Sequence, residues 1–205
     1  MPDTPDMPAL NAPSVSICVY CGSRPGRHAA HAAAARETGA LIGRLGWQLV
    51  YGGGRAGLMG EVADATLAAG GRVVGVIPES LKELEVGHPG LHELHVVPTM
   101  HVRKQMMAER ADVFIALPGG IGTLEELYEV WTWRQLGYHD QPIGLVNTQG
   151  YFDPLLLFMA HTVAEGFLAP AQHALLRVDS DPEGLLLQLA ELSAASGQPD
   201  DFSRV

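Results

Sequence analysis

The stretch LPGGIGTLEE, residues 117–126, joins the end of a buried apolar strand to the start of a helix through a glycine-rich turn. Gly119, Gly120 and Gly122 carry no Cβ atoms, so an anion can come close to the backbone N–H groups of the turn. The helix is predicted to begin near Thr123, which would direct its free N–H groups and the positive end of its dipole at the same place. The stretch therefore predicts an anion-binding turn between a strand and a helix.

The same order of strand, turn and helix repeats along the chain, which predicts a parallel sheet with helices on both faces. Strands are predicted near residues 15–21, 47–51, 72–77, 93–97, 112–117, 142–147 and 175–178. Helices are predicted near residues 28–45, 57–70, 100–111, 123–138, 152–166 and 182–195, with a short uncertain segment at 79–90. We expect an α/β fold with a doubly wound, Rossmann-like parallel sheet of about seven strands.

The composition suits one soluble enzyme domain. The chain has 205 residues, 47% hydrophobic content and 24 glycines, enough for a sizeable core in a single domain over residues 15–195. Residues 1–14 and 196–205 are rich in Pro, Asp, Ser and Gly and are expected to be disordered tails. No internal repeat or linker divides the chain.

The charge pattern bears on the class of partner. A formal charge of −10 and the absence of a Lys/Arg run argue against nucleic acid or an anionic membrane as the main partner. No stretch of about 18 uninterrupted apolar residues occurs, and the first residues do not resemble a signal peptide. A cytoplasmic location is the default expectation.

Three small-residue turns follow three of the predicted strands: residues 21–23 (CGS), 52–54 (GGG) and 118–120 (PGG). Parallel sheets of this type bind ligands at the carboxyl ends of their strands, near the point where the strand order reverses. The three turns therefore predict one shared crevice.

Two further patterns keep alternatives open. Gly52, Gly54 and Gly57 match G-x-G-x-x-G, but a dinucleotide fold would put this fingerprint after its first strand, and the glycines could equally serve only a tight turn. No Walker-type phosphate loop occurs.

Cys18 and Cys21 are spaced as C-x-x-C but lie within and at the end of a strand, which favours two inert thiols over a redox or metal role.

The run MHVRK, residues 100–104, opens the helix before the fifth strand and carries Lys104, one of only two lysines in the chain. Arg103 and Lys104 could simply lie on a solvated helix face. Cations near a helix N-terminus oppose the helix dipole, however, so a bound anion would explain them.

These motifs together resemble the LOG family, the cytokinin riboside 5′-monophosphate phosphoribohydrolases, whose members were often labelled "lysine decarboxylase". CGS, GGGRAGLMG, MHVRK and PGGIGTLEE occur in the family's order and spacing, and the resemblance runs from about Ser16 to Phe167. It implies a Rossmann-like homodimer that hydrolyses the N-glycosidic bond of an adenine-type nucleoside 5′-monophosphate to free base and ribose 5-phosphate. It implies no cofactor and no metal.

Transferred to this chain, the family's catalytic pair falls on Arg103 and Glu126. The predicted substrate-binding residues are Gly22, Ser23, Gly53, Gly54, Met59, Glu85, Lys104, Gly119, Gly120, Gly122, Thr123 and Glu125. The sequence of residues 84–88, around Glu85, differs from the one usual in the family.

The chemistry of the residues agrees with this assignment. Cleavage of a ribosyl C–N bond builds positive charge on the sugar, which a carboxylate such as Glu126 can stabilise while it activates a water molecule. Arg103 cannot donate a proton at neutral pH, so it should bind substrate or orient a carboxylate. Thr123 and Glu126 also match a capping box, in which the glutamate would only satisfy a backbone N–H. Glu125 is the substitute candidate for Glu126.

Competing functions and a possible interface complete the expectations. A lysine decarboxylase would need a Schiff-base lysine, and only Lys82 and Lys104 are available. A non-catalytic nucleotide carrier or sensor is the more serious alternative, because the same loops would bind a nucleotide without turning it over.

The helix over 123–138 carries an apolar stripe with Trp131 and Trp133, which could form a partner surface or be intramolecular core.

Overall fold

The computed structural model of the protein describes residues 14–82, 87–196 and 200–202. It contains a seven-stranded parallel sheet with the strand order β4-β3-β2-β1-β5-β6-β7. The strands are β1 (Ser16–Tyr20), β2 (Gln48–Tyr51), β3 (Arg72–Pro78), β4 (Glu93–Val97), β5 (Val113–Ala116), β6 (Ile143–Val146) and β7 (Leu176–Asp179). This confirms the predicted α/β fold with a doubly wound parallel sheet.

The connections between the strands are helical. They are α1 (Ala29–Arg44), α2 (Gly57–Ala68), the short α3 (Glu79–Lys82), α4 (Met100–Glu109), α5 (Ile121–Gln135), α6 (Asp153–Ala164), α7 (Pro170–His173) and α8 (Pro182–Ala194), with a 3₁₀ turn η1 at Thr148–Gly150. The predicted strands and the six longer helices all occur, with ends that differ by at most three residues. Helix α7 and the turn η1 were not predicted, because each is a single turn and too short to show a periodic pattern.

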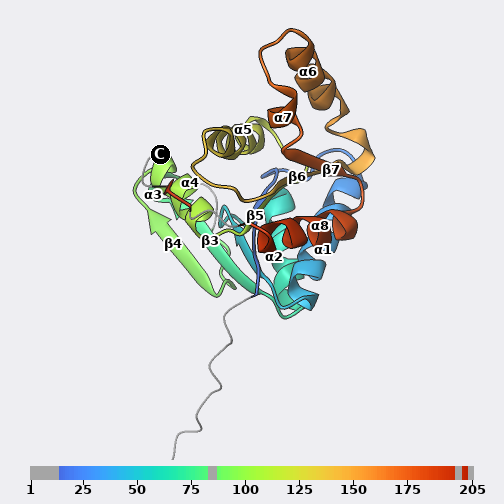
Figure 1. Ribbon diagram of the computed structural model, residues 1–205. Helices are drawn as coiled ribbons and strands as arrows, with labels where there is room; N and C mark the ends of the chain where they lie inside the picture. The colour runs from blue at the N-terminus through green and yellow to red at the C-terminus, as the bar shows by residue number, and fades with distance from the viewer. Residues whose placement is uncertain (1–13, 83–86, 197–199, 203–205) are drawn as a thin grey trace, which may run out of the picture.

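Helices cover both faces of the sheet (Figure 1). On one face α1, α2 and α8 pack against alternate strand residues, with Ile42, Val62 and Leu186 fully buried in that layer. On the other face α4 and α5 pack against the remaining strand residues, among them Phe114. Because the strand order reverses between β1 and β5, the loops after these two central strands diverge to opposite faces and leave a crevice between them.

The apolar stripe of α5 belongs to the protein's own core. Trp131 and Trp133 are 4% and 7% exposed. The Trp131 ring stacks on Tyr128 and its indole N–H donates to the carbonyl of Gln172, while Trp133 packs on Phe202. The tryptophans therefore do not form the partner surface considered from the sequence, because residues of the same chain already cover both side chains.

Part of the C-terminal segment packs on the domain. Phe202 is only 6% exposed and contacts the rings of Trp133 and His139, and Asp200 accepts a hydrogen bond from Gln141. For residues 200–202 this differs from the disordered tail expected over 196–205. One aromatic side chain close to the chain's end was enough to fill a gap beside α5, which composition alone does not reveal. Of the expected N-terminal tail, only residue 14 lies within the described residues.

Helices α6 and α7 project from the body of the molecule (Figure 1). Within α6 only Met159 is buried, whereas Leu157 and Phe158 are exposed. In the part of the chain that the structure describes, no helix combines the length and the apolar character needed to cross a bilayer. The cytoplasmic location expected from the sequence stays a prediction.

Candidate active site

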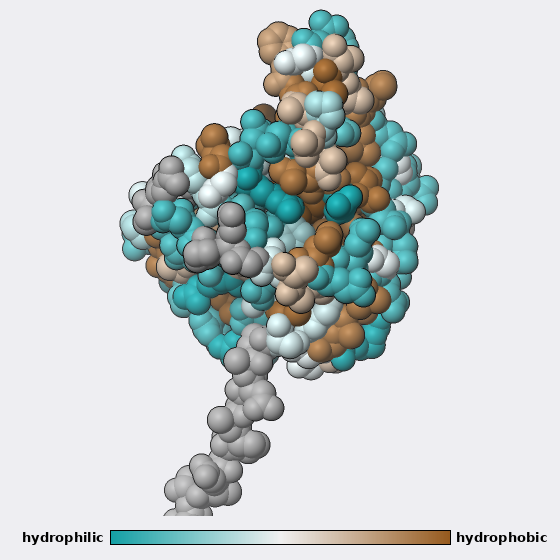
Figure 2. Space-filling model, viewed as in Figure 1, coloured by the Kyte–Doolittle hydropathy of each residue, from teal (hydrophilic) through white to brown (hydrophobic). Residues whose placement is uncertain are grey.

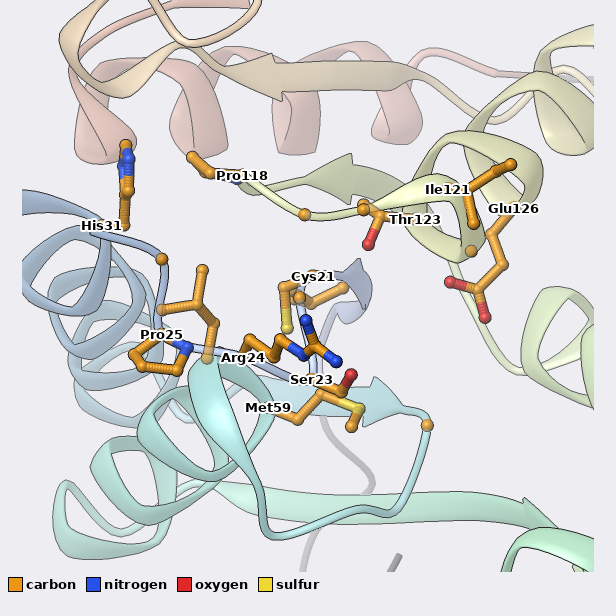
Figure 3. A pocket seen from close by; sticks show the side chains of 18 of the residues that line it. Cys21, Ser23, Arg24, Pro25, His31, Met59, Pro118, Ile121, Thr123 and Glu126 are labelled. Carbon is orange, nitrogen blue, oxygen red and sulfur yellow. The ribbon is translucent and has the colours of Figure 1, made fainter. Parts of the chain in front are cut away.

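A cavity of about 830 Å³ lies at the carboxyl end of the sheet. Its walls come from the turns after β1, β2 and β5, from one side of α4, and from Tyr151. Figure 3 shows several of the lining residues, among them Ser23, Arg24 and Thr123. The three turns are joined by backbone hydrogen bonds: Gly22 N–H donates to the Pro118 carbonyl, and Leu58 N–H donates to the Gly22 carbonyl. The glycine turns therefore share one crevice, as their positions after the strands predicted.

The turn after β5 combines one packed glycine with two open ones. A Cβ atom on Gly119 would overlap the side chain of Thr123 and press on Gly22, so Gly119 is required by packing. A Cβ atom on Gly120 or Gly122 would meet no protein atom within 4 Å. Both open glycines line the cavity, which leaves room for a ligand beside the backbone N–H groups.

Helix α5 begins at Ile121, two residues earlier than expected, with Gly120 as its N-cap and no side chain accepting a hydrogen bond there. Thr123 lies inside the first turn and is buried against Gly119. The capping box considered for Thr123 and Glu126 is therefore wrong, because Thr123 is not the N-cap residue. The first N–H groups of α5 have no partner within the helix and remain available to an anion.

Arg103 and Glu126 form a buried ion pair beside this turn. The Arg103 Nη1 atom lies 3.5 Å from Glu126 Oε1, and the two side chains are 9% and 11% exposed. Arg103 Nε donates to the Val76 carbonyl at 3.1 Å, which fixes the guanidinium beside β3. Its Nη2 atom occupies the space where a Cβ atom of residue 52 would lie, so Gly52 makes room for it.

Glu126 is an unusual carboxyl group. Burial raises its pKa to about 7, and the nearby charge of Arg103 limits this rise. A carboxyl group with a pKa near neutrality can take up or release a proton at working pH. Together with its position on the cavity wall, this gives Glu126 the properties of a general base or a charge-stabilising carboxylate.

Lys104 lies outside the cavity wall. Its Nζ atom donates to Glu125 Oε1 at 2.6 Å and to Glu129 Oε1 at 2.8 Å. Two carboxylates on α5 therefore compensate the lysine charge, and no bound anion is needed to explain it. Glu125 lies at the cavity, but its side chain is 51% exposed and forms an ion pair with Lys104. The structure thus favours Glu126 over Glu125 as the carboxylate that faces a ligand.

Most of the residues predicted to bind substrate do come together. Those that line the cavity are Gly22, Ser23, Met59, Gly119, Gly120, Gly122, Thr123 and Glu125, together with the pair Arg103 and Glu126. Gly53 and Gly54 do not line it: they turn towards residues 87–88, where Gly54 pairs with Gly87 and the Gly53 carbonyl accepts from His88 N–H. Glu85 lies outside the described residues.

The G-x-G-x-x-G match has an explanation within the protein. Gly52 accommodates Arg103, and a Cβ atom on Gly57 would overlap the backbone of Ser23 and Arg24. Gly57 also has a positive φ of 60°, which favours glycine. Since a protein side chain fills the space beside Gly52, this turn is not arranged for the pyrophosphate of a dinucleotide.

Several cavity residues were missed in the sequence. They include Arg24, Pro25, Gly26, Arg27 and His28 in the loop after β1, His31 on α1, and Tyr151 after β6. The basic pattern RPGRH directly after CGS was the available signal for the first group. Tyr151 gave none, because only the tertiary fold brings it to the Gly119 carbonyl, to which its hydroxyl donates.

The two cysteines are free and buried. Burial raises the pKa of both thiols well above the usual range, so neither forms a thiolate near neutral pH. Cys21 lies in the cavity wall. Within the described residues, no group of three or more His, Cys, Asp or Glu side chains is placed to share a metal ion.

Comparison with known proteins places the chain in a family. Residues 59–189 match a family model described as "Possible lysine decarboxylase". Among solved structures, the molybdenum cofactor carrier protein of Chlamydomonas reinhardtii shares the fold, with a TM-score of 0.68 and 23% identity over 88% of this chain and 98% of that chain. At this identity the likeness concerns the fold alone.

Proteins related in sequence share a much higher identity with the chain. The cytokinin riboside 5′-monophosphate phosphoribohydrolase of Rhodococcoides fascians is 50% identical over 172 residues, covering 83% of this chain and 87% of the relative. The cytokinin riboside 5′-monophosphate phosphoribohydrolase LOG of Oryza sativa subsp. japonica is 49% identical over 175 residues, covering 85% of this chain and 72% of the relative. The chain therefore belongs to the LOG family, the family of the cytokinin riboside 5′-monophosphate phosphoribohydrolases.

Proposed function

We propose that the protein hydrolyses the N-glycosidic bond of cytokinin riboside 5′-monophosphates and of AMP, releasing the free base and ribose 5-phosphate. The observation that carries this proposal is the buried ion pair of Arg103 and Glu126 in the wall of a cavity that also contains the free N-terminus of α5. The names of the close relatives support the same reaction.

The proposed mechanism assigns the carboxylate to the sugar. As the bond between C1′ and the base nitrogen breaks, its electron pair leaves with the base and C1′ becomes cationic. The ionised Glu126 stabilises this cation and takes a proton from the water molecule whose oxygen bonds to C1′. The base takes a proton from solvent as it leaves, and Glu126 afterwards returns its proton to solvent, so that one water molecule is added across the bond. Arg103 stays charged throughout and holds Glu126 in position through their ion pair.

A decarboxylase mechanism with a Schiff-base lysine does not fit these residues. Lys104 is not part of the cavity wall, and its ammonium group donates to Glu125 and Glu129. Lys82 ends the short helix α3 and is likewise no part of the cavity wall. The sequence contains no third lysine. The cavity wall therefore offers no lysine that could form a Schiff base with a ligand.

The test separates hydrolysis from mere binding. The protein is incubated with AMP, with isopentenyladenosine monophosphate and with adenosine, and free base and ribose 5-phosphate are assayed. We expect turnover of the monophosphates, little turnover of adenosine, and loss of turnover in Glu126→Gln. Tight binding of AMP by the wild-type protein without release of adenine would contradict the proposal and favour a nucleotide carrier or sensor.

We also propose that the protein is a homodimer, as the family resemblance implies, with α6 at the interface. In Figure 2 hydrophobic residues gather on the projecting helix and on the face below it. Leu157, Phe158 and Phe167 are 75%, 59% and 88% exposed. A second copy that packs on this helix would bury these side chains through the same surface on both protomers.

A further inference from the structure

We propose that Arg24 and Arg27, in the loop between β1 and α1, hold the phosphate group of the substrate against the N-terminus of α5, and that Arg103 and Lys104 do not. This inference rests on the proposed function, in that it names the group that binds the phosphate of a nucleoside monophosphate. Neither arginine lies within the four motifs that carry the family resemblance, CGS, GGGRAGLMG, MHVRK and PGGIGTLEE.

The first argument is the arrangement of charge around the cavity. Arg24 and Arg27 line it, and among the residues that the structure describes neither has an ion pair or a side-chain hydrogen bond. Arg103 is paired with Glu126, and Lys104 is paired with two carboxylates. The uncompensated positive charge of the cavity therefore lies in the loop after β1.

The second argument is a buried histidine in the same wall. His31 is only 6% exposed, and its Nδ1 atom is buried without a hydrogen-bond partner. Its ring lies edge-on to His28 and to Tyr151. Buried polar atoms normally have partners, so a missing partner in a cavity wall points to a ligand. A phosphate oxygen can accept a hydrogen bond from the imidazole N–H.

The third argument is the geometry of the cavity. In Figure 3 His31 and Pro25 lie at one side and Glu126 at the other, and the turn from Pro118 to Thr123 runs between His31 and Glu126. An anion at the free N–H groups of α5 would meet the arginines from one side. Glu126 follows Ile121 by five residues, about 7.5 Å along the helix axis, which leaves room for a ribose between phosphate and carboxylate. Arginine suits this role because its planar fork matches phosphate oxygens.

The experiment measures binding of ribose 5-phosphate by isothermal titration calorimetry, without any need for catalysis. Arg24→Gln and Arg27→Gln are compared with the wild-type protein, and Arg44→Gln, at the far end of α1, is the matched control for the same loss of charge. We expect each loop variant to weaken binding about tenfold, the double variant about a hundredfold, and the control to stay within about twofold. Circular dichroism confirms that the exposed substitutions leave the fold intact.

A kinetic measurement completes the test. For AMP the loop variants should raise KM with little change in kcat, because a phosphate contact contributes equally to ground state and transition state. Wild-type affinity for ribose 5-phosphate in the double variant, or no binding by the wild-type protein at millimolar concentration, would overturn the inference. Arginine-dependent binding without any AMP hydrolysis would instead refute the proposed function and leave this site in place.

Discussion

At the scale of single residues, the cavity combines a carboxyl group that resists ionisation with a guanidinium that is always charged. Glu126 is buried, which raises its pKa to about 7, and Arg103 holds it at 3.5 Å. The pair remains in place because Val76 accepts from Arg103 Nε and Gly52 has no side chain to displace it. Two testable consequences follow from these contacts.

The first concerns pH. Since the folded-state pKa of Glu126 lies above its usual value, the carboxylate that the mechanism needs is present above pH 7 and is lost as the pH falls through 7. The value of kcat/KM for AMP should therefore rise with pH and reach half of its plateau near pH 7. Glu126→Gln should lower kcat about 10² or more and remove this limb. A variant with full activity would exclude Glu126 as the catalytic carboxylate.

The second concerns the space beside Arg103. Gly52→Ala should displace the guanidinium and lower kcat at least about tenfold, while the protein stays folded because only the end of a flexible side chain must move. Steady-state kinetics and thermal unfolding measure both effects. In an Arg103→Ala background, Gly52→Ala should cause no further loss of kcat, because the two changes act on one contact. Equal losses in both backgrounds would mean that Gly52 acts independently of Arg103.

At the scale of elements, the N-terminus of α5 is the feature that links the fold to ligand binding. The helix begins at Ile121 behind a glycine N-cap with no side-chain partner, and Gly120 and Gly122 face open space. Neither position needs glycine for packing. Gly122 lies inside the first turn of α5, where glycine lowers helix stability relative to alanine, and close approach of a ligand is a physical reason for keeping it.

This reasoning predicts a conflict between stability and function. Gly122→Ala should leave the free energy of unfolding unchanged or raise it by up to about 1 kcal/mol, because alanine is the better helix former. Both Gly122→Ala and Gly120→Ala should raise KM for AMP, because the new methyl group occupies the anion's position. Gly119→Ala is the control with the opposite sign: its Cβ atom overlaps Thr123 and should lower stability. An unchanged KM in both open-glycine variants would place the anion elsewhere.

At the scale of the whole molecule, the exposed apolar surface of α6 predicts self-association. Sedimentation equilibrium at micromolar concentration should give about twice the chain mass of 21.9 kDa. Phe158→Glu should shift the protein to the monomer, because a charge cannot be buried at an apolar interface without a partner. Leu187→Glu, a similarly exposed position on α8, is the control and should leave the dimer intact. A wild-type mass near 22 kDa would refute the dimer.

Local chemistry in the sequence determined much of this architecture. Most of the strands are apolar runs, and turns of small residues follow three of them, so all seven strands were predictable within a few residues. The convergence of three glycine turns followed from the rule that parallel strands present their carboxyl ends at one edge. The pair Arg103 and Glu126 came from the spacing of family motifs, and the structure brings the two residues into contact.

Tertiary structure alone decided which charges are free. In the sequence Lys104 resembled an anion ligand, but two glutamates on helix α5 bind it. Arg24 and Arg27 lie outside the motifs of the family resemblance, yet they line the cavity without an ion pair. Trp131 and Trp133 resembled an interface in the sequence, but other residues of the same chain bury them. The reason is the same in each case. Secondary structure depends on residues near in sequence, whereas charge compensation and burial depend on residues that only the folded chain brings together.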